Sequence, residues 1–303
     1  MTATNPQSAR SFRVGLIGHG IQASLSPALH ELAGARAGFD YSYELIDLQR
    51  LGADPAELPR LLSEAESAGF SGVNITHPCK QLVIDYLDEL SPQARRIGAV
   101  NTVVFHAGRR TGHNTDCWGF EQAFREGANG ALVRKVVQLG AGGAGSAVAH
   151  ALLDMSAGSV LLCDVDGERA ERLARKLCDH FGPRRAVAIA ASALDAAMGE
   201  ADGLVHATPT GMASHPGLPL SADLLTPGHW VAEIVYFPLE TELLRVARSK
   251  GCRTIDGSGM AVYQAMGAFR LFTGVDPDAA QMRRDFDRLV GAADSTLAET
   301  AAQ

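Results

Sequence analysis

Short runs of apolar residues alternate with stretches of helical periodicity along most of the chain. The runs are Val14–Ile17, Tyr43–Ile46, Val73–Ile75, Val136–Leu139, Val160–Cys163, Val187–Ala190, Leu204–Ala207 and Val231–Tyr236. The helical stretches between them include Pro55–Ala68, Ala144–Met155, Glu168–His180 and Thr241–Lys250. Strands that are apolar throughout are typical of parallel sheets covered on both faces and joined by right-handed crossovers. The alternation therefore predicts an α/β fold built from βαβ units.

The length of 303 residues corresponds to about two domains of ordinary size. A strand, a glycine turn and a helix begin afresh at Lys135, whereas the helical segment Gly259–Val290 does not easily belong to the sheet that follows. We expect one domain of residues 1–116 and 257–303, and a second domain of residues 117–256 inserted into it. A cleft between two domains is a common place for a ligand.

Composition and charge exclude several classes of protein. Lys plus Arg number 27 and Asp plus Glu number 34, which gives a net charge of -7 and no basic cluster for nucleic-acid binding. The polar residues 1–12 lack the apolar core of a signal peptide, and glycines interrupt the uncharged stretch 136–153, so we expect a cytoplasmic protein without membrane spans. Neither the histidines nor the cysteines have metal-ligand spacing, so no metal site and no disulfide framework are expected. The five cysteines are Cys79, Cys117, Cys163, Cys178 and Cys252.

A glycine-rich turn follows the apolar run Val136–Leu139. Its sequence is Gly140-Ala141-Gly142-Gly143-Ala144-Gly145, which has GxGxxG spacing between a strand and a helix. Gly140 would allow the tight turn, Gly142 the approach of a pyrophosphate, and Gly145 close packing of helix against strand. The first amides of the helix would then bind the phosphates. This context favours a dinucleotide site over a glycine turn without a ligand.

An acidic residue stands where such a site binds the adenosine ribose. Asp164 ends the next strand, 19 residues beyond Gly145, and a carboxylate there accepts hydrogen bonds from both ribose hydroxyls. It would repel a 2′-phosphate, so NAD is expected rather than NADP. Arg169 lies one helical turn further on and is a candidate for reaching a phosphate; the alternative is a solvated surface arginine.

Polar residues follow another strand of the first domain and return at its end. Thr76 and Lys80 come after Val73–Ile75, and Asp116 closes the segment from Gly112. A lysine and an aspartate in a cleft can form a proton-transfer pair. Alternatively, Lys80 is a surface lysine at a helix start and Asp116 is the N-cap of a helix that begins at Trp118. The residues alone favour this second interpretation for each of the two. His77 and His113 are interpreted as hydrogen-bonding loop residues.

Taken together, these motifs resemble those of the shikimate dehydrogenases in kind and in order, over residues 13 to 290. The matching segments are Ser24–Pro27, Asn74–Lys80, Gly98–Thr102, Gly112–Asp116, the turn at Gly140, Ala207–Met212, Ile234–Tyr236 and Asp256–Gln264. Details such as His229-Trp230-Val231 and Glu240–Leu244 are most similar to the NAD-dependent quinate/shikimate dehydrogenase branch. The resemblance implies an α/β substrate domain and a Rossmann domain that binds NAD.

The resemblance also implies roles for single residues. Lys80 would be the general acid/base and Asp116 its partner. Ser24 and Ser26 would bind the substrate carboxylate. The remaining substrate contacts would come from Thr76, Asn101, Tyr236 and Gln264. Ile234 and Gly257 would line the nicotinamide site, and the loop Ala207–Met212 would pass beside the cofactor.

The implied reaction is the reversible, NAD-dependent oxidation of shikimate to 3-dehydroshikimate, with quinate also accepted. NADP-using relatives usually carry an Asn-Arg-Ser/Thr stretch where this chain has Asp164-Val165-Asp166, which favours NAD. Ser26 is the residue of shikimate-favouring relatives, so shikimate is expected to be the better substrate. The alternatives are a catalytically silent regulator that senses these metabolites and an aminoshikimate dehydrogenase. Expected partners are small molecules, and the chain would act as a monomer or homodimer.

Overall fold

The computed structural model describes residues 10–128 and 130–301, with side chains described up to residue 293. The chain forms two compact units. The first contains the residues up to Ser91, Val100–His113 and Ala265–Leu289, and the second contains Pro92–Ala99, Asn114–Gln264 and the residues from Val290 onward. Both units are α/β structures, which confirms the predicted fold class. The assignment of residues 1–116 and 257–303 to substrate binding, and of 117–256 to NAD binding, stays a prediction.

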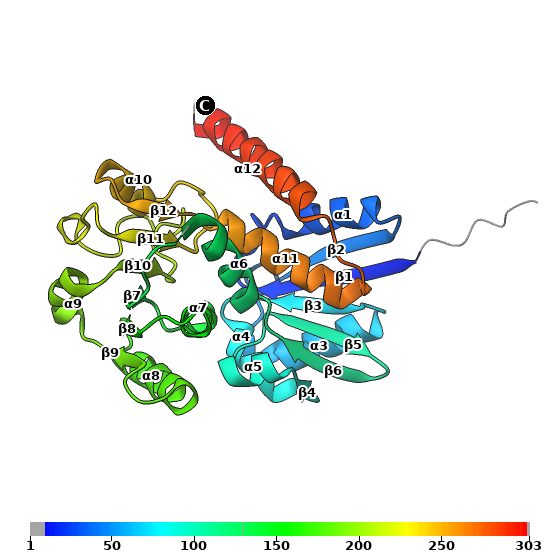
Figure 1. Ribbon diagram of the computed structural model, residues 1–303. Coiled ribbons are helices and arrows are strands. Elements are labelled where there is room, and N and C mark those ends of the chain that lie inside the picture. Colours follow the sequence, from blue (N-terminus) through cyan, green and yellow to red (C-terminus); the bar gives the residue numbers. More distant parts are fainter. Residues whose placement is uncertain (1–9, 129, 302–303) are drawn as a thin grey trace, which may run out of the picture. The chain divides into compact units, whose positions relative to one another are not determined.

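The first unit holds a mixed sheet of six strands in the order β2-β1-β3-β5-β6-β4 (Figure 1). Its strands are β1 (Ser11–Gly18), β2 (Asp40–Asp47), β3 (Gly72–Ile75), β4 (Glu89–Leu90), β5 (Thr102–His106) and β6 (Arg109–His113). β1, β2 and β3 are parallel, whereas β5 runs antiparallel to β3 and forms a hairpin with β6. The start of β5 therefore lies at the same edge of the sheet as the end of β3. The helices are α1 (Ser26–Arg36), α2 (Leu48–Leu51), α3 (Leu58–Ser67) and α4 (Cys79–Leu82).

The second unit holds six parallel strands in the order β12-β11-β10-β7-β8-β9, the doubly wound order of a Rossmann fold. They are β7 (Lys135–Leu139), β8 (Ser159–Cys163), β9 (Ala186–Ala188), β10 (Gly203–His206), β11 (Trp230–Glu233) and β12 (Arg253–Ile255). The helices are α5 (Pro92–Ile97), α6 (Asp116–Ala128), α7 (Gly143–Asp154), α8 (Gly167–Phe181), α9 (Leu194–Glu200) and α10 (Glu242–Ser249). Among the described residues, no helix has both the length and the apolar character needed to cross a bilayer.

The strands β11 and β12 of this sheet differ from the expected runs. The run Val231–Tyr236 leaves the sheet after Glu233, because the amide of Val235 bonds to the Glu233 carboxylate instead of a neighbouring strand. β12 was not predicted, since three residues with an exposed arginine at their start carry little strand signal.

The chain returns to the first unit through α11 (Ser258–Thr273) and α12 (Ala279–Ala301). Ala268 and Phe272 of α11 are buried against Val14 and Leu16 of β1 and against Tyr43 of β2. This apolar contact explains why the helical segment is not part of the second sheet: its buried side chains complete the core of the first unit.

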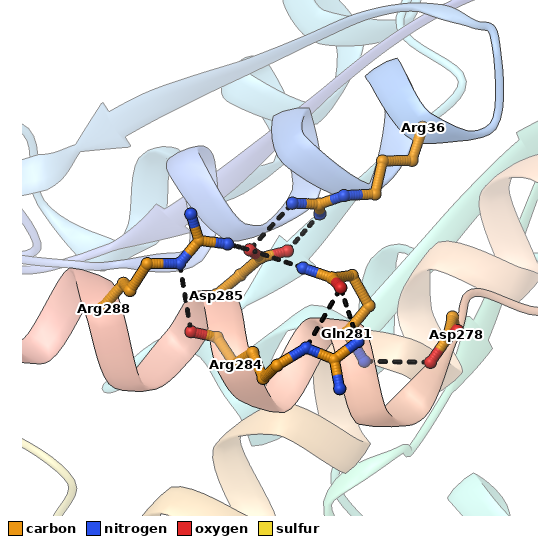
Figure 2. Close-up of polar contacts among 6 residues, drawn as sticks. All are labelled: Arg36, Asp278, Gln281, Arg284, Asp285 and Arg288. Carbon is orange, nitrogen blue, oxygen red and sulfur yellow. Dashed lines mark hydrogen bonds and ion pairs between the residues drawn. The ribbon is translucent and has the colours of Figure 1, made fainter.

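A buried carboxylate joins α12 to α1 (Figure 2). Asp285 accepts hydrogen bonds from both terminal nitrogens of Arg36, and from Gln281 at 3.2 Å and Arg288. Burial opposes ionisation, but the bonds from Arg36 and Gln281 outweigh it and lower the pKa of the Asp285 carboxyl. Its contribution to stability is therefore present above the pKa of an unfolded aspartate and is lost as the pH falls through the lowered value.

Asp285→Asn removes this charge with little change in volume and should destabilise the protein by about 2 kcal/mol at pH 7, since hydrogen bonds between charged groups are lost. The midpoint of urea unfolding, followed by circular dichroism, measures the effect, which should shrink near pH 3. Glu64→Gln is the control, because the Arg60–Glu64 pair is more than half exposed on both sides and should contribute little. Equal urea midpoints for Asp285→Asn and the native chain at pH 7 would contradict the assignment.

Candidate functional site

The carboxyl edge of the first unit's parallel strands gathers five of the expected site residues. Ser24 and Ser26 follow β1, Thr76 and Lys80 follow β3, and Asn101 directly precedes β5. Because β5 is antiparallel to β3, Asn101 starts its strand at the edge where β3 ends, and the amide of Ile75 donates to its carbonyl at 2.8 Å. Ligands of parallel sheets bind at this edge.

The two serines lie at the amino end of α1. Both are half-buried, and the Ser24 hydroxyl accepts a hydrogen bond from the amide of Ser26 at 3.3 Å. No side chain caps the helix at Leu25. The hydroxyls therefore stand beside the positive end of an 11-residue helix, which favours a negatively charged ligand.

The loop that leads to these serines is held by Asp47, a buried residue that the sequence did not single out. Its carboxylate accepts from the amides of Gly20 at 2.8 Å, Ile21 at 3.2 Å and Gln49 at 3.1 Å, and from the Gln22 side chain at 2.9 Å. Burial acts to raise the pKa of Asp47, but these bonds outweigh it and lower the pKa. The carboxylate at the end of β2 thus fixes the conformation of the loop after β1.

Thr76 and Lys80 are placed by the turn from β3 into α4. The Thr76 methyl packs so closely on Gly18 that a Cβ at position 18 would lie 2.2 Å from it. Lys80 is half-buried on the first turn of α4, and its carbonyl accepts from the amide of Val100 at 2.8 Å. The lysine is therefore attached to the segment that carries Asn101.

Asn74 is a structural neighbour of Asn101. Its amide donates to the Asn101 carbonyl at 3.2 Å and to the Thr102 hydroxyl at 3.0 Å, and its oxygen accepts from the Tyr43 hydroxyl at 2.9 Å. The Thr102 hydroxyl in turn donates to the Asn101 side chain at 3.0 Å. These bonds orient Asn101 from within the core.

The second unit carries Asp116 on the first turn of α6, where it is buried. The interpretation of Asp116 as the N-cap of a helix starting at Trp118 is wrong: α6 already begins at Asp116, and the Asn114 side chain accepts from the Cys117 amide at 3.1 Å. The capping bond is made by Asn114, so the Asp116 carboxylate is not needed for it. Lys80 belongs to the first unit and Asp116 to the second.

The amino-terminal half of α11 brings Gln264 to this part of α6. The Thr115 hydroxyl donates to the Gln264 carbonyl at 2.9 Å, and a Cβ at Gly119 would lie 2.9 Å from the Gln264 nitrogen. Gln264 is half-buried. The expected substrate-binding residue Gln264 therefore lies beside Thr115, the residue that precedes Asp116, although the two segments are far apart in the chain.

The glycine turn has the geometry that a pyrophosphate requires. Gly140 has a φ of +100°, and a Cβ at Gly145 would lie 2.3 Å from the Gly140 carbonyl oxygen, so helix and strand meet in close contact. Gly142 is the N-cap of the 12-residue helix α7 and makes no side-chain capping bond, and among the described residues no atom outside its chain neighbours lies within 4 Å of a Cβ placed on it. The open backbone at Gly142 and the first amides of α7 fit a dinucleotide phosphate.

Asp164 lies at the end of β8 beside this turn. Its side chain is only 6% exposed and accepts from the amides of Ala141 at 2.7 Å and Asp166 at 2.9 Å. Arg169 lies 3.3 Å from both Asp164 and Asp166 and is 44% exposed. The structure thus places Arg169 beside Asp164, the residue expected to bind the ribose, and pairs it with two carboxylates.

Ile234 and Gly257 also come together. A Cβ at Gly257 would lie 2.5 Å from the Val235 carbonyl oxygen and 2.9 Å from that of Ile234. Tyr236 follows directly and is half-buried. A second group beside this segment, His206 with Glu233, was missed because neither residue belongs to a motif.

Family comparisons cover both ends of the chain. Residues 16–103 match the shikimate dehydrogenase substrate binding domain, and residues 257–284 match the shikimate 5'-dehydrogenase C-terminal domain. A shikimate dehydrogenase (NADP(+)) of Streptomyces avermitilis is 59% identical over 93% of this chain and 97% of its own length. A quinate/shikimate dehydrogenase (NAD(+)) of Corynebacterium glutamicum is 46% identical over 91% and 98%.

Solved structures agree with these matches. The quinate dehydrogenase of Corynebacterium glutamicum in complex with NAD superposes with a TM-score of 0.84 at 46% identity, covering 91% of this chain and 99% of that one. The shikimate 5-dehydrogenase of Thermus thermophilus in complex with NADP(H) and shikimate gives 0.79 at 38% identity, covering 92% and 99%. Because relatives of 46% to 59% identity match over more than nine tenths of the chain, the chain belongs to the shikimate dehydrogenase family.

Proposed function

We propose that this protein catalyses the reversible, NAD-dependent oxidation of shikimate to 3-dehydroshikimate and accepts quinate as a second substrate. The observation that carries the proposal is the grouping of Ser24, Ser26, Thr76, Lys80 and Asn101 at one edge of the first sheet. In this proposal residues 1–116 and 257–303 bind the substrate, and residues 117–256 bind the dinucleotide.

The substrate carboxylate would be bound by neutral donors. Ser24 and Ser26 supply two hydroxyls at the start of α1, where the helix dipole favours an anion. Asp47 holds the loop before them through the backbone amides of Gly20 and Ile21 and the side chain of Gln22, so the hydroxyls are positioned before the ligand arrives. Thr76, Asn101, Tyr236 and Gln264 would bind the carboxylate and the remaining hydroxyls.

The reacting hydroxyl would give its proton to Lys80 during oxidation and recover it during reduction. Asp116 would bond to a ring hydroxyl and orient the lysine. When bound, the nicotinamide supplies the hydride acceptor or donor. The residues expected to line its site, Ile234 and Gly257, already lie in contact through the backbone of the second unit.

NAD is proposed as the preferred cofactor because of the charges around Asp164. A phosphate on the adenosine ribose would approach a carboxylate that is almost buried, with Asp166 next to it. Two basic groups lie nearby: Arg169 is paired with both carboxylates, and Arg172 lies 3.7 Å from Asp166. The relative of 59% identity is named for NADP and the relative of 46% identity for NAD, so the names do not decide the cofactor. The proposal of NAD therefore rests on the charges around Asp164.

Initial rates of reduced-cofactor formation, with shikimate or quinate each combined with NAD or NADP, test the proposed function. Shikimate with NAD should give the highest kcat/KM, and quinate with NAD a lower but measurable one. Absence of turnover with every combination would contradict an enzymatic role and favour a metabolite-sensing regulator. Turnover confined to an amino-substituted analogue of shikimate would favour an aminoshikimate dehydrogenase.

Lys80→Ala should lower kcat by more than about 100-fold with little change in the KM for shikimate, because the proton acceptor is lost while the binding groups remain. Lys250→Ala is the matched control, since Lys250 lies at the carboxyl end of α10. Steady-state rates at saturating NAD provide the measurement. A kcat of Lys80→Ala within a few-fold of the native value would refute the assignment.

Asp164→Ala should lower the ratio of kcat/KM for NAD to that for NADP by about tenfold or more, because the ribose loses a charged acceptor and a 2′-phosphate loses its repulsion. Glu168→Ala is the control: its carboxylate lies in the same segment but is 87% exposed. The cofactor ratio is measured at saturating shikimate. If Asp164→Ala leaves this ratio at the native value, Asp164 does not select the cofactor.

A further inference from the structure

Two buried ionisable side chains face each other at the ends of neighbouring strands in the second unit. His206 is the last residue of β10, and Glu233 is the last residue of β11. The Nδ1 atom of His206 lies 2.9 Å and 3.0 Å from the two carboxylate oxygens of Glu233. Both side chains are fully shielded from solvent.

Hydrogen bonds join the pair to the loops that follow both strands. The Nε2 atom of His206 lies 2.5 Å from the Thr208 hydroxyl. One Glu233 oxygen accepts from the amide of Val235 at 3.0 Å, and the other accepts from the Thr241 hydroxyl at 3.1 Å. The Thr241 hydroxyl also caps α10 by accepting from the Leu244 amide at 3.3 Å.

The loop Ala207–Met212 is held tightly between this network and the glycine turn. A Cβ at Gly211, whose φ is +95°, would lie 3.2 Å from Thr241. On the other side, a Cβ at Gly140 would lie 2.5 Å from the Ala207 carbonyl oxygen. A change in the buried pair therefore acts on a loop that has little room to adjust.

Such a network is costly to bury for stability alone. Well-packed apolar side chains often stabilise a core as well as a buried ion pair does. The carboxyl ends of β10 and β7 flank the point where the strand order reverses, which is where ligands of doubly wound sheets bind. The location of the pair indicates a role in the binding loops.

We propose that His206 and Glu233 are positioning residues that hold the loop Ala207–Met212 and the segment Ile234–Tyr236 in the arrangement that binds the nicotinamide half of the dinucleotide. The inference rests on the proposed cofactor site. It assigns the pair to one half of the ligand. The side-chain bonds of His206 and Glu233 run to Thr208, Val235 and Thr241, and none of these bonds reaches Asp164 or the turn at Gly142.

Two ligands separate this role from a general effect on the fold. NADH carries the nicotinamide, whereas ADP-ribose shares the adenosine and pyrophosphate but lacks the nicotinamide. His206→Asn, Glu233→Gln and Thr208→Val should each weaken NADH binding by about tenfold, the loss of one well-made hydrogen bond, and ADP-ribose binding by less than about twofold. Dissociation constants are measured by calorimetry without substrate. Thr208→Val keeps the test informative if a core variant does not fold, because Thr208 lies on the loop and is half-buried.

Asp202→Asn provides the matched control in the same sheet. Asp202 is also a largely buried carboxylate that accepts backbone amides, from Arg134 at 2.6 Å and Lys135 at 3.1 Å, but it lies at the opposite edge. It should lower the thermal midpoint without changing the ratio of the two affinities. If the variants that fold bind NADH and ADP-ribose with equally weakened affinity, or bind NADH as tightly as the native chain, the positioning role is wrong while the proposed function stands. A native chain that binds neither NADH nor NADPH would overturn the proposed function and this inference with it.

Discussion

Carboxylates at the ends of parallel strands, which accept one or more backbone amides from the loops around them, are the interaction on which the binding edges of this molecule depend. Asp47 does this at the end of β2, Asp164 after β8, and Glu233 at the end of β11. A loop without regular structure has amides that need acceptors, and a buried carboxylate can accept several at once. Each candidate ligand loop is thereby fixed by a group that lies behind it.

This arrangement separates the residues that bind from those that position. Ser24 and Ser26, which are proposed to bind the substrate, follow a loop whose shape is set by Asp47, and Asn101 is oriented by Asn74 and Thr102. Preformed sites lose less conformational entropy when the ligand binds. The two hydroxyls are neutral, but the partial positive charge at the amino end of α1 would add to their attraction for a substrate carboxylate.

The parallel strands and the glycine turn could be predicted because they have local signals: continuous apolar runs, and glycines at positions where the backbone approaches itself. Asp116 was interpreted in one reading as an N-cap, whereas Asn114 makes that bond. The positioning residues could not be predicted, because Asp47 and Glu233 act on partners from other strands or loops. His206 and Glu233 meet only after two strands have paired in register. β12 was missed because its position is set by pairing with β11 rather than by its own sequence.

The proposed function depends most on Lys80, which would exchange a proton with the substrate hydroxyl while Ser24 and Ser26 bind the substrate carboxylate. A crystal structure with shikimate and NAD bound tests this most directly. Lys80 Nζ should lie within about 3.2 Å of the hydroxyl to be oxidised, while the shikimate carboxylate contacts Ser24 and Ser26. Shikimate bound with its reacting hydroxyl beyond hydrogen-bond reach of Lys80, or with its carboxylate away from both serines, would refute the proposed mechanism.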